Sequence, residues 1–414
     1  MQNKTLRSVL IVFVSIVLVV CVFGSGFVVG NFVPALKPAS VPTLSSTPGN
    51  NQGGTPADLQ SQFAPFWQAW DLVHQYYVDK SQLDDTILMQ GAVRGMMDAI
   101  GDKFSGYWDP SETADANNTM QGEYDGIGAW VDISGDYLTI TEPMTGSPAE
   151  QAGLLTGDQI IAVDGVDVTG MKPELVRKLK VLGPAGTSIH LTVLRQGQEQ
   201  PLEFDITRAH IVVPSVTSRM LDDNIAYIKI ILFGDNTAND FKEQLGTLMA
   251  QNPHAIILDL RNNGGGYVSA AITVASQFIS NGVIFYEETA DGTRTPNNAE
   301  PDGLATGSLP MVVLVNQFSA SASEIVSGAL QDTGRAKLLG VKTYGKGSEQ
   351  NWIPLSDGST ARITIAKWLT PNGTSIHGTG LTPDITVEMT TEDYQAGRDP
   401  QLDAAVQYLL NPQP

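Results

Sequence analysis

Cysteine is nearly absent from this sequence, because the only one among 414 residues is Cys21, inside an apolar run near the N-terminus. The rest of the chain therefore has no disulfide, no cysteine-based zinc site and no thiol nucleophile. The five histidines are scattered, and neither a His-Glu-x-x-His nor a Gly-x-Ser-x-Gly motif occurs. Metalloproteases that bind zinc through His-Glu-x-x-His, and hydrolases whose serine lies in a Gly-x-Ser-x-Gly nucleophile elbow, are thereby excluded.

Positive charge is also scarce, with 24 basic against 44 acidic residues and a net charge of −20. Nucleic acid and anionic lipid surfaces repel an acidic protein, so we expect a protein or peptide partner and no nucleic acid. The length exceeds one ordinary core and predicts two or three domains.

The longest apolar run, 9–33, follows Lys4 and Arg7. As a helix it would span roughly 37 Å, enough for a hydrocarbon core of about 30 Å. We predict an uncleaved single-pass anchor, with residues 1–8 as a cytoplasmic tail and the rest of the chain outside the cytoplasm of a bacterial-type cell. A cleaved signal peptide is the alternative.

Composition divides the remainder into four parts. Residues 34–57 are rich in Pro, Ser, Thr, Gly and Asn and predict a flexible linker. In 58–121 apolar residues recur at helical spacing, which predicts two helices broken near 79–84. Residues 122–208 carry short strands punctuated by glycine, and 209–414 alternate strand and helix. These patterns predict a helical segment, a compact β-rich module and an α/β core.

The expected elements of the last two parts follow from local patterns. Residues 147–154, SPAEQAGL, read as a short helix with a Ser cap, a Pro at its first position and a Gly stop. Continuous apolar runs in the α/β part are typical of buried parallel strands. Strands are predicted at 128–133, 137–141, 159–163, 188–195, 225–233, 255–260, 311–316, 338–341 and 361–368, and helices at 173–182, 237–251, 268–280 and 321–333.

Ser321 stands where the predicted strand 311–316 turns into a helix, in the sequence SASASE at 319–324. The unpaired N–H groups of a first helical turn, that of Ala322 among them, can stabilise an oxyanion beside Ser321. The same residues form the Ser-x-x-Glu pattern of a capping box, in which the hydroxyl only satisfies a helix N–H. Both interpretations stay open on these residues alone.

Lys346 lies between two glycines, in the sequence YGKG at 344–347. Glycine lets the backbone pass close to another element. To act as a base the lysine must be neutral, which requires burial to lower its pKa below about 10.4. An ordinary lysine in a surface turn is the alternative. If the segment is a strand, Gln350 shares a face with Lys346 and could hold its amine.

Three glycines follow the predicted strand 255–260, in the sequence RNNGGG at 261–266. Their bare N–H groups can hold an anion, either a phosphate or an oxyanion. A nucleotide site is disfavoured because the Gly-x-x-x-x-Gly-Lys-Ser/Thr pattern is missing. A second oxyanion donor for Ser321 fits better.

Together these residues resemble the carboxyl-terminal processing peptidases, the tail-specific serine proteases. The resemblance covers most of the chain after the linker, with the motifs in the family's order. Phe104 replaces a tyrosine that is usual in the first motif. The matching segments are 102–107 (DKFSGY), 259–265 (DLRNNGG), 316–324, 331–332, 343–350 and 378–384 (GTGLTPD), and 122–208 is similar to the family's PDZ domain.

The resemblance implies a crotonase-like α/β peptidase core that carries an inserted PDZ domain. It also implies the catalytic residues: Ser321 as nucleophile, Lys346 as general base and Gln350 as the residue that orients the lysine. The implied oxyanion donors are the Ala322 N–H and the glycine turn, where Gly264 is preferred over Gly265. The carboxylate-binding loop of the PDZ domain would hold a peptide C-terminus through Gly126, Ile127 and Gly128.

The expected function is that of a membrane-anchored serine endopeptidase that cleaves proteins near their C-termini. In it the PDZ domain binds substrate C-termini, and whether that domain also gates activity stays open. A non-catalytic PDZ scaffold is the first alternative, and a crotonase-like acyl-transfer enzyme is the second. No metal or other cofactor is implied, and a homo-oligomer is left open.

Overall fold

The computed structural model describes most of the chain, namely residues 55–132, 135–198, 200–390, 392–393 and 396–411. The predicted tail, the predicted anchor at 9–33 and the linker up to residue 54 lie outside the described residues. Within the part that is described, no helix is both long and apolar enough to cross a membrane.

The chain divides into two compact units, Met1–Asp84 and Asp85–Pro414. In the first unit, helix α2 (Gln60–Tyr76) is followed by a 3₁₀ turn, η1 (Lys80–Gln82). The helix ends because the next residue, Tyr77, takes an extended backbone with ψ of 132°. The break predicted near 79–84 is confirmed.

The second unit begins with α3 (Asp85–Asp98), β1 (Gly106–Trp108) and α4 (Pro110–Gln121). A capping box starts α4: the Glu112 N–H donates to the Asp109 side chain at 2.9 Å, and the Asp109 N–H donates to the Glu112 side chain at 3.1 Å. The helix stops at Gly122, whose φ of 77° disfavours any side chain.

The β-rich module follows as a small sheet with an added two-stranded ribbon. Its elements are β2 (Glu123–Gly126), β3 (Ala129–Asp132), β4 (Leu138–Pro143), α5 (Pro148–Ala152), β5 (Gln159–Val163), β6 (Val166–Asp167), α6 (Pro173–Val176), the π-helical η2 (Arg177–Val181), β7 (Ser188–Leu194), β8 (Leu202–Thr207) and β9 (Ala209–Val212). The predicted strands appear as β3, β4, β5 and β7. In the ribbon β2 pairs antiparallel with β9, and the Val213 N–H donates to the Gly122 carbonyl at 2.7 Å.

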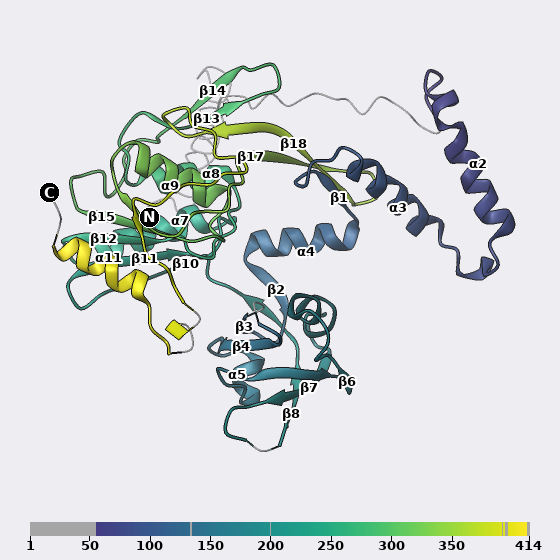
Figure 1. The fold of residues 1–414 in the computed structure, drawn as a ribbon, viewed down its shortest axis with the longest axis horizontal. Helices are drawn as coiled ribbons and strands as arrows, with labels where there is room; N and C mark the ends of the chain where they lie inside the picture. The colour runs from purple at the N-terminus through teal and green to yellow at the C-terminus, as the bar shows by residue number, and fades with distance from the viewer. Residues whose placement is uncertain (1–54, 133–134, 199, 391, 394–395, 412–414) are drawn as a thin grey trace, which may run out of the picture. The chain divides into compact units, whose positions relative to one another are not determined.

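The α/β core is built on a six-stranded sheet of order β10-β11-β12-β15-β16-β19 (Figure 1). Its elements are β10 (Val216–Met220), β11 (Ile225–Ile230), α7 (Thr237–Met249), β12 (Ala255–Asp259), α8 (Val268–Ser276), β15 (Met311–Val315), α9 (Ala322–Asp332), β16 (Lys337–Gly340), β19 (Ile385–Thr386) and α11 (Pro400–Leu410). Only β10 runs antiparallel to its neighbour. The strands and helices predicted in this part are confirmed, with β11 ending three residues early and α8 four residues early.

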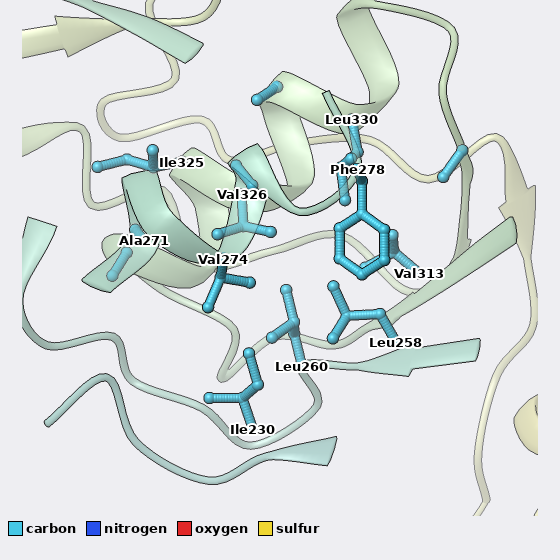
Figure 2. Packing of buried hydrophobic residues seen from close by; sticks show 14 of the residues in the cluster. Ile230, Leu258, Leu260, Ala271, Val274, Phe278, Val313, Ile325, Val326 and Leu330 are labelled. Atoms are coloured by element: carbon cyan, nitrogen blue, oxygen red, sulfur yellow. The ribbon is translucent and has the colours of Figure 1, made fainter. Parts of the chain in front are cut away.

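Buried side chains cover both faces of this sheet, because alternate residues of a strand point to opposite sides. On one face Leu258 and Val313 pack against α8 and α9, where they meet Val326 (Figure 2). On the other face Ile257 packs with Leu409 of α11. Full burial of such a side chain is worth about 1.5–3 kcal/mol. This packing places the carboxyl ends of β12 and β15, and the loops that follow them, at one edge.

A second sheet is antiparallel and has the order β1-β18-β13-β14, with β17 alongside β18. The new strands are β13 (Val283–Glu288), β14 (Arg294–Asn298), β17 (Ser348–Pro354) and β18 (Thr360–Leu369). Of these only β18 was predicted, because the others mix polar and apolar residues without a clear period. Strands β1 and β13 pair with opposite ends of β18, and β17 runs along most of its length.

Candidate active site

Ser321 is the last residue before α9, at the corner that follows β15. Its φ of 56° and ψ of −117° are unusual for a residue with a side chain, and such a backbone persists only where the surroundings enforce it. Two hydrogen bonds hold this corner: the Ser319 hydroxyl donates to the Leu260 carbonyl at 2.8 Å, and the Ala320 N–H donates to the Asn263 carbonyl at 3.0 Å. Ser321 thus occupies the strand-to-helix corner that the sequence predicts.

The start of α9 carries both features that the sequence left open. The glutamate half of a capping box is present, because the Ser321 N–H donates to Glu324 Oε2 at 2.9 Å, while the Glu324 N–H donates to the Ser321 backbone carbonyl at 2.8 Å. Ala322 is the first residue of the helix, so its N–H has no acceptor within the helix and lies at the positive end of the dipole. The capping role and an oxyanion-binding role are compatible, because they use different groups.

The carboxylate of Glu324 is fully buried and accepts four hydrogen bonds. Its Oε2 accepts the Ser321 N–H and the Lys346 N–H, each at 2.9 Å. Its Oε1 accepts the Thr343 hydroxyl at 2.5 Å and the Gly345 N–H at 2.7 Å. Burial raises the pKa of Glu324, and these hydrogen bonds counteract part of that rise. One carboxylate therefore joins the serine segment to the lysine segment.

Lys346 lies two residues before β17, and its side chain is half-buried. Its ammonium nitrogen lies 5.4 Å from the centroid of the Phe104 ring. Burial, and then the positive charge of Arg362, lower the pKa of Lys346, while the charges of Glu324 and Asp102 act to raise it. A lowered pKa increases the fraction of neutral amine at a given pH, which is what a lysine needs in order to accept a proton.

The glycine turn after β12 lies directly against the serine. A Cβ at Gly265 would come within 2.7 Å of the Ser321 Cβ and 3.0 Å of the Ala322 nitrogen, and its φ of 102° is itself unfavourable for a side chain. The Gly265 N–H donates to Asn263 Oδ1 at 2.8 Å. Gly264 is exposed, with open space where a Cβ would stand. Of the two glycines, Gly265 is the one in contact with the serine.

Gln350 does not meet the condition of the same-face argument. Lys346 lies before the strand that contains Gln350, and Gly347 separates it from the first strand residue. The alternation of side chains along a strand therefore does not extend to Lys346. The Gln350 amide nitrogen donates to the Ser348 hydroxyl at 3.0 Å and to the Thr364 hydroxyl at 3.1 Å. The role implied for Gln350 by resemblance stays a prediction.

Thr364 belongs to a polar cluster around Asp102. Asp102 Oδ2 accepts the Thr364 hydroxyl at 2.5 Å and the Ser105 hydroxyl at 2.7 Å. Burial acts to raise the pKa of Asp102, but these hydrogen bonds outweigh burial, and the pKa is lowered. Asp102 is therefore an anion whose charge reaches Lys346, and Thr364 connects it to Gln350.

The predicted peptide-binding residues lie together where β2 leads into β3. Gly126 ends β2, the side chain of Ile127 is buried in the core of the module, and Gly128 precedes β3. The Tyr124 ring lies over Gly126, where a Cβ would come within 2.9 Å of it, and the Tyr124 hydroxyl lies 3.8 Å from the sulfur of Met144. The sequence had assigned Tyr124 no part in this loop.

Sequence reasoning missed two contributors to the serine corner, namely Asn263 and the full role of Glu324. Asn263 is buried, and its amide donates to the Ile230 carbonyl at 2.8 Å while accepting the Gly265 N–H. An asparagine beside glycines usually indicates only a turn, and a glutamate at the third helical position usually indicates only a cap. No local signal separated these roles from the ordinary ones.

Two acidic residues near the site, Asp259 and Asp399, are engaged by hydrogen bonds and ion pairs with other side chains of the chain. Asp259, at the end of β12, accepts the Tyr227 hydroxyl and an Arg261 N–H, both at 2.7 Å. Arg261 also binds Asp399 at 2.7 Å, which ties the end of β12 to the start of α11. Among the described residues, no group of three or more His, Cys, Asp or Glu is arranged to hold a metal ion.

Three family models match successive parts of the chain. Residues 224–387 match peptidase family S41, and residues 139–195 match the PDZ domain. Residues 24–113 match the N-terminal domain of the activating protease CtpB. The first match contains Ser321 and Lys346.

Whole-chain relatives agree with these models. The chain is 35% identical to the carboxy-terminal-processing protease of Bartonella bacilliformis, over 90% of this chain and 84% of the relative. It is 36% identical to the carboxy-terminal processing protease CtpA of Bacillus subtilis, over 84% of this chain and 73% of that protein. Among solved structures, the photosystem II D1 C-terminal processing protease aligns with a TM-score of 0.52 at 29% identity, covering 78% of this chain and 92% of the other.

Proposed function

Because this chain belongs to the carboxy-terminal processing serine proteases of peptidase family S41, we propose that it cleaves proteins near their C-termini with a dyad of Ser321 and Lys346. The observation that carries the residue assignment is the Glu324 carboxylate, whose Oε2 accepts both the Ser321 N–H and the Lys346 N–H. Two backbone segments held by one oxygen atom support a pairing of the hydroxyl with the amine.

In the proposed reaction the neutral amine of Lys346 accepts the Ser321 hydroxyl proton while the serine oxygen attacks the scissile carbonyl carbon. The oxyanion receives hydrogen bonds from the Ala322 N–H and from the glycine turn. The Lys346 ammonium then gives its proton to the leaving amine, the C–N bond breaks, and an acyl-enzyme remains. A water molecule, deprotonated by Lys346, attacks the acyl carbon, the ester bond to the Ser321 oxygen breaks, and Lys346 returns the proton to that oxygen as the new carboxyl terminus is released.

Gly264 stays the preferred donor in the glycine turn, because the N–H of Gly265 is engaged by Asn263. The close contact of Gly265 with Ser321 gives that glycine a different role, namely to let the turn approach the serine. For Gln350, a place in the cluster of Thr364 and Asp102 supports a positioning role that is exerted through those residues.

The PDZ domain is proposed to hold the free C-terminus of a substrate. Its backbone N–H groups at Gly126, Ile127 and Gly128 would bind the carboxylate, and the peptide would add as a strand beside β3. A fluorescent peptide titrated against the Ser321→Ala variant tests this proposal. Equal affinity for the free and the amidated peptide would refute it.

The proposed location is the outer side of a cell membrane, with residues 9–33 as an uncleaved anchor. Fractionation of cells that express the full chain, followed by protease treatment of intact spheroplasts, tests both parts. We expect the chain in the membrane fraction and its PDZ and peptidase parts digested. Recovery of the full chain from the soluble fraction would refute the anchor.

Two substitutions test the dyad. Ser321→Ala removes the nucleophile and Lys346→Ala removes the base, so each should abolish turnover, and Ser321→Ala should also abolish labelling by an active-site serine probe. Activity should rise with pH through the lowered pKa of Lys346, because the ammonium cannot accept a proton. Turnover by folded Ser321→Ala, or full activity at pH 4, would refute the assignment. A chain that binds peptides but never reacts with the probe would favour the PDZ scaffold.

A further inference from the structure

The guanidinium group of Arg362 is a shielded charge: burial lowers its pKa, and the charge of Asp102 acts to raise it. Its side chain is half-buried, and its Nε is buried with no hydrogen-bond acceptor. Within the described part of the chain, this side chain forms no hydrogen bond or ion pair. Other shielded arginines do make hydrogen bonds: Arg261 binds two carboxylates, and Arg208 and Arg335 donate to backbone carbonyls, although Nε of Arg335 also has no acceptor. An unpaired shielded charge is costly, and natural proteins rarely keep one without a use.

Aromatic rings hold this guanidinium in place. Arg362 lies opposite Gly106 of β1 and opposite Trp352 of β17. Its guanidinium carbon is 4.6 Å from the centroid of the Trp108 ring, and the Trp108 ring meets Trp352 edge-to-face at 4.7 Å. An arginine stacked on an aromatic ring keeps its N–H groups, at the rim of the guanidinium plane, free for a ligand.

This group shares a face of β18 with Thr364, a member of the polar cluster around Asp102. Arg362 and Thr364 are two positions apart on the strand, so their side chains point to the same side, about 6.6 Å apart along it. Thr364 binds Asp102 and Gln350. That distance equals two residues of an extended peptide.

Charge coupling gives independent evidence that Arg362 lies near the dyad. The positive charge of Arg362 is the second cause, after burial, of the lowered pKa of Lys346. The other charges that act on Lys346 are Glu324, which donor groups already surround, and Asp102, whose oxygen accepts two hydroxyl groups. Arg362 is the only one of these charged groups that still has its full hydrogen-bonding capacity.

We propose that Arg362 binds a carboxylate of the substrate beside the scissile bond and thereby selects which peptides are cleaved. The inference rests on the proposed function, since it needs a peptide bound at the Ser321 dyad. A planar guanidinium binds a carboxylate through two parallel hydrogen bonds, which suits this fixed and stacked group. The carboxylate has two sources, the α-carboxylate of a short C-terminal tail or the side chain of an aspartate or glutamate in the substrate.

Four peptides of one sequence distinguish these sources: a free or an amidated C-terminus, each with glutamate or glutamine near the cleaved bond. The ratio of kcat/KM between a charged peptide and its neutral partner is measured for the wild type and for Arg362→Gln. Any contribution of the PDZ domain to that ratio is the same in both enzymes and cancels. Lys367→Gln is the control, because it removes an exposed charge from a position near the other end of β18.

Arg362→Gln should reduce the charged-to-neutral ratio about 10- to 100-fold, chiefly through KM, and Arg362→Lys should retain part of it, as expected for one charge-assisted contact. A reduction confined to the free C-terminus assigns the α-carboxylate, and one confined to glutamate assigns the side chain. An unchanged ratio, or an equal loss on all four peptides with a pH profile shifted upward, overturns the proposal, because Arg362 then acts only on the pKa of Lys346.

The cleavage rates of the wild-type enzyme on the four peptides give a further test, which does not depend on whether a variant folds. It should cleave the glutamate or the free-carboxylate peptide faster than the doubly neutral one, and raising the salt concentration should reduce the difference. A wild type without any such preference overturns the proposal. Failure of the dyad would look different, because Ser321→Ala would then still cleave all four peptides.

Discussion

Replacing Glu324 by glutamine tests whether one carboxylate sets the geometry of the whole site. The substitution keeps the shape of the side chain but turns one acceptor oxygen into an NH₂ donor. Each carboxylate oxygen now accepts two hydrogen bonds. The amide therefore has two possible orientations, and they differ in which pair of donors it faces.

The less harmful orientation puts the NH₂ group at the position of Oε1. The Thr343 hydroxyl, which already accepts the Leu381 N–H at 2.7 Å, can turn and accept from the amide as well. The Gly345 N–H then stays unpaired, and the bonds to Ser321 and Lys346 lose their charge assistance. Losing one such bond inside a protein and weakening two others costs about 2–4 kcal/mol. The opposite orientation leaves both the Ser321 and the Lys346 N–H groups facing a donor and costs more.

Urea unfolding gives the stability change, and initial rates on a peptide substrate give kcat. We expect a loss of about 2–4 kcal/mol together with a fall in kcat of roughly 100-fold, because small displacements of reacting groups have effects of that size. Glu112→Gln is the matched control, since Glu112 is also the third residue of a capped helix, but its side chain is 30% exposed. It should cost less than about 1 kcal/mol and leave kcat unchanged. Unchanged stability and kcat in folded Glu324→Gln would refute the reasoning.

Two further substitutions follow from contacts at the site. Gly265→Ala would bring a Cβ within 2.7 Å of the Ser321 Cβ at a φ of 102°, so kcat should fall at least about 10-fold and stability by about 1–3 kcal/mol. Gly264→Ala meets open space and should change stability by less than about 0.5 kcal/mol. Equal losses of stability in urea unfolding of the two variants would contradict this reasoning. Burial and the Glu287 charge raise the pKa of Glu349 to about 7, so the folded protein favours the neutral carboxyl group. The contribution of this group to stability is fully present below its unfolded pKa near 4.5 and is lost as the pH rises through 7, where the buried group must ionise. Glu349→Gln should therefore stabilise the protein by roughly 2–3 kcal/mol at pH 8 and hardly at pH 4, and a gain that does not depend on pH would count against the shifted pKa.

The buried strands of the α/β core could be predicted because apolar runs such as 255–260 and 311–316 have one physical explanation, burial on both faces of a parallel sheet. The second sheet could not be predicted in the same way. Its strand β17 begins with four polar residues, 348–351, which show no alternation of polar and apolar side chains. Strand β1 has three residues and is stabilised by its pairing with β18, which lies 250 positions away in the sequence.

The residues of the candidate site also divide into those with a local sequence signature and those that depend on contacts between distant segments. Ser321 and the glycine turn were found because helix starts and glycine corners have local signatures. Glu324 was found only as a cap, since its bond to the Lys346 N–H depends on a contact between segments that sequence spacing does not reveal. Arg362 gave no signal at all, because an arginine in a strand says nothing about whether the fold will supply a partner for its charge.

The ribbon of β2 and β9 brings the two ends of the PDZ domain together, so that the domain could be replaced by another one. The chain enters the domain at Gly122 and leaves it at Val213, and one hydrogen bond joins these two points. Any domain whose own termini lie side by side could be spliced in there without moving α4, whose last turn is held to the core by the bond from the Asp235 N–H to the Met120 carbonyl at 3.0 Å. Recombination could thus change the proposed binding of substrate C-termini while the proposed dyad of Ser321 and Lys346 is inherited unchanged.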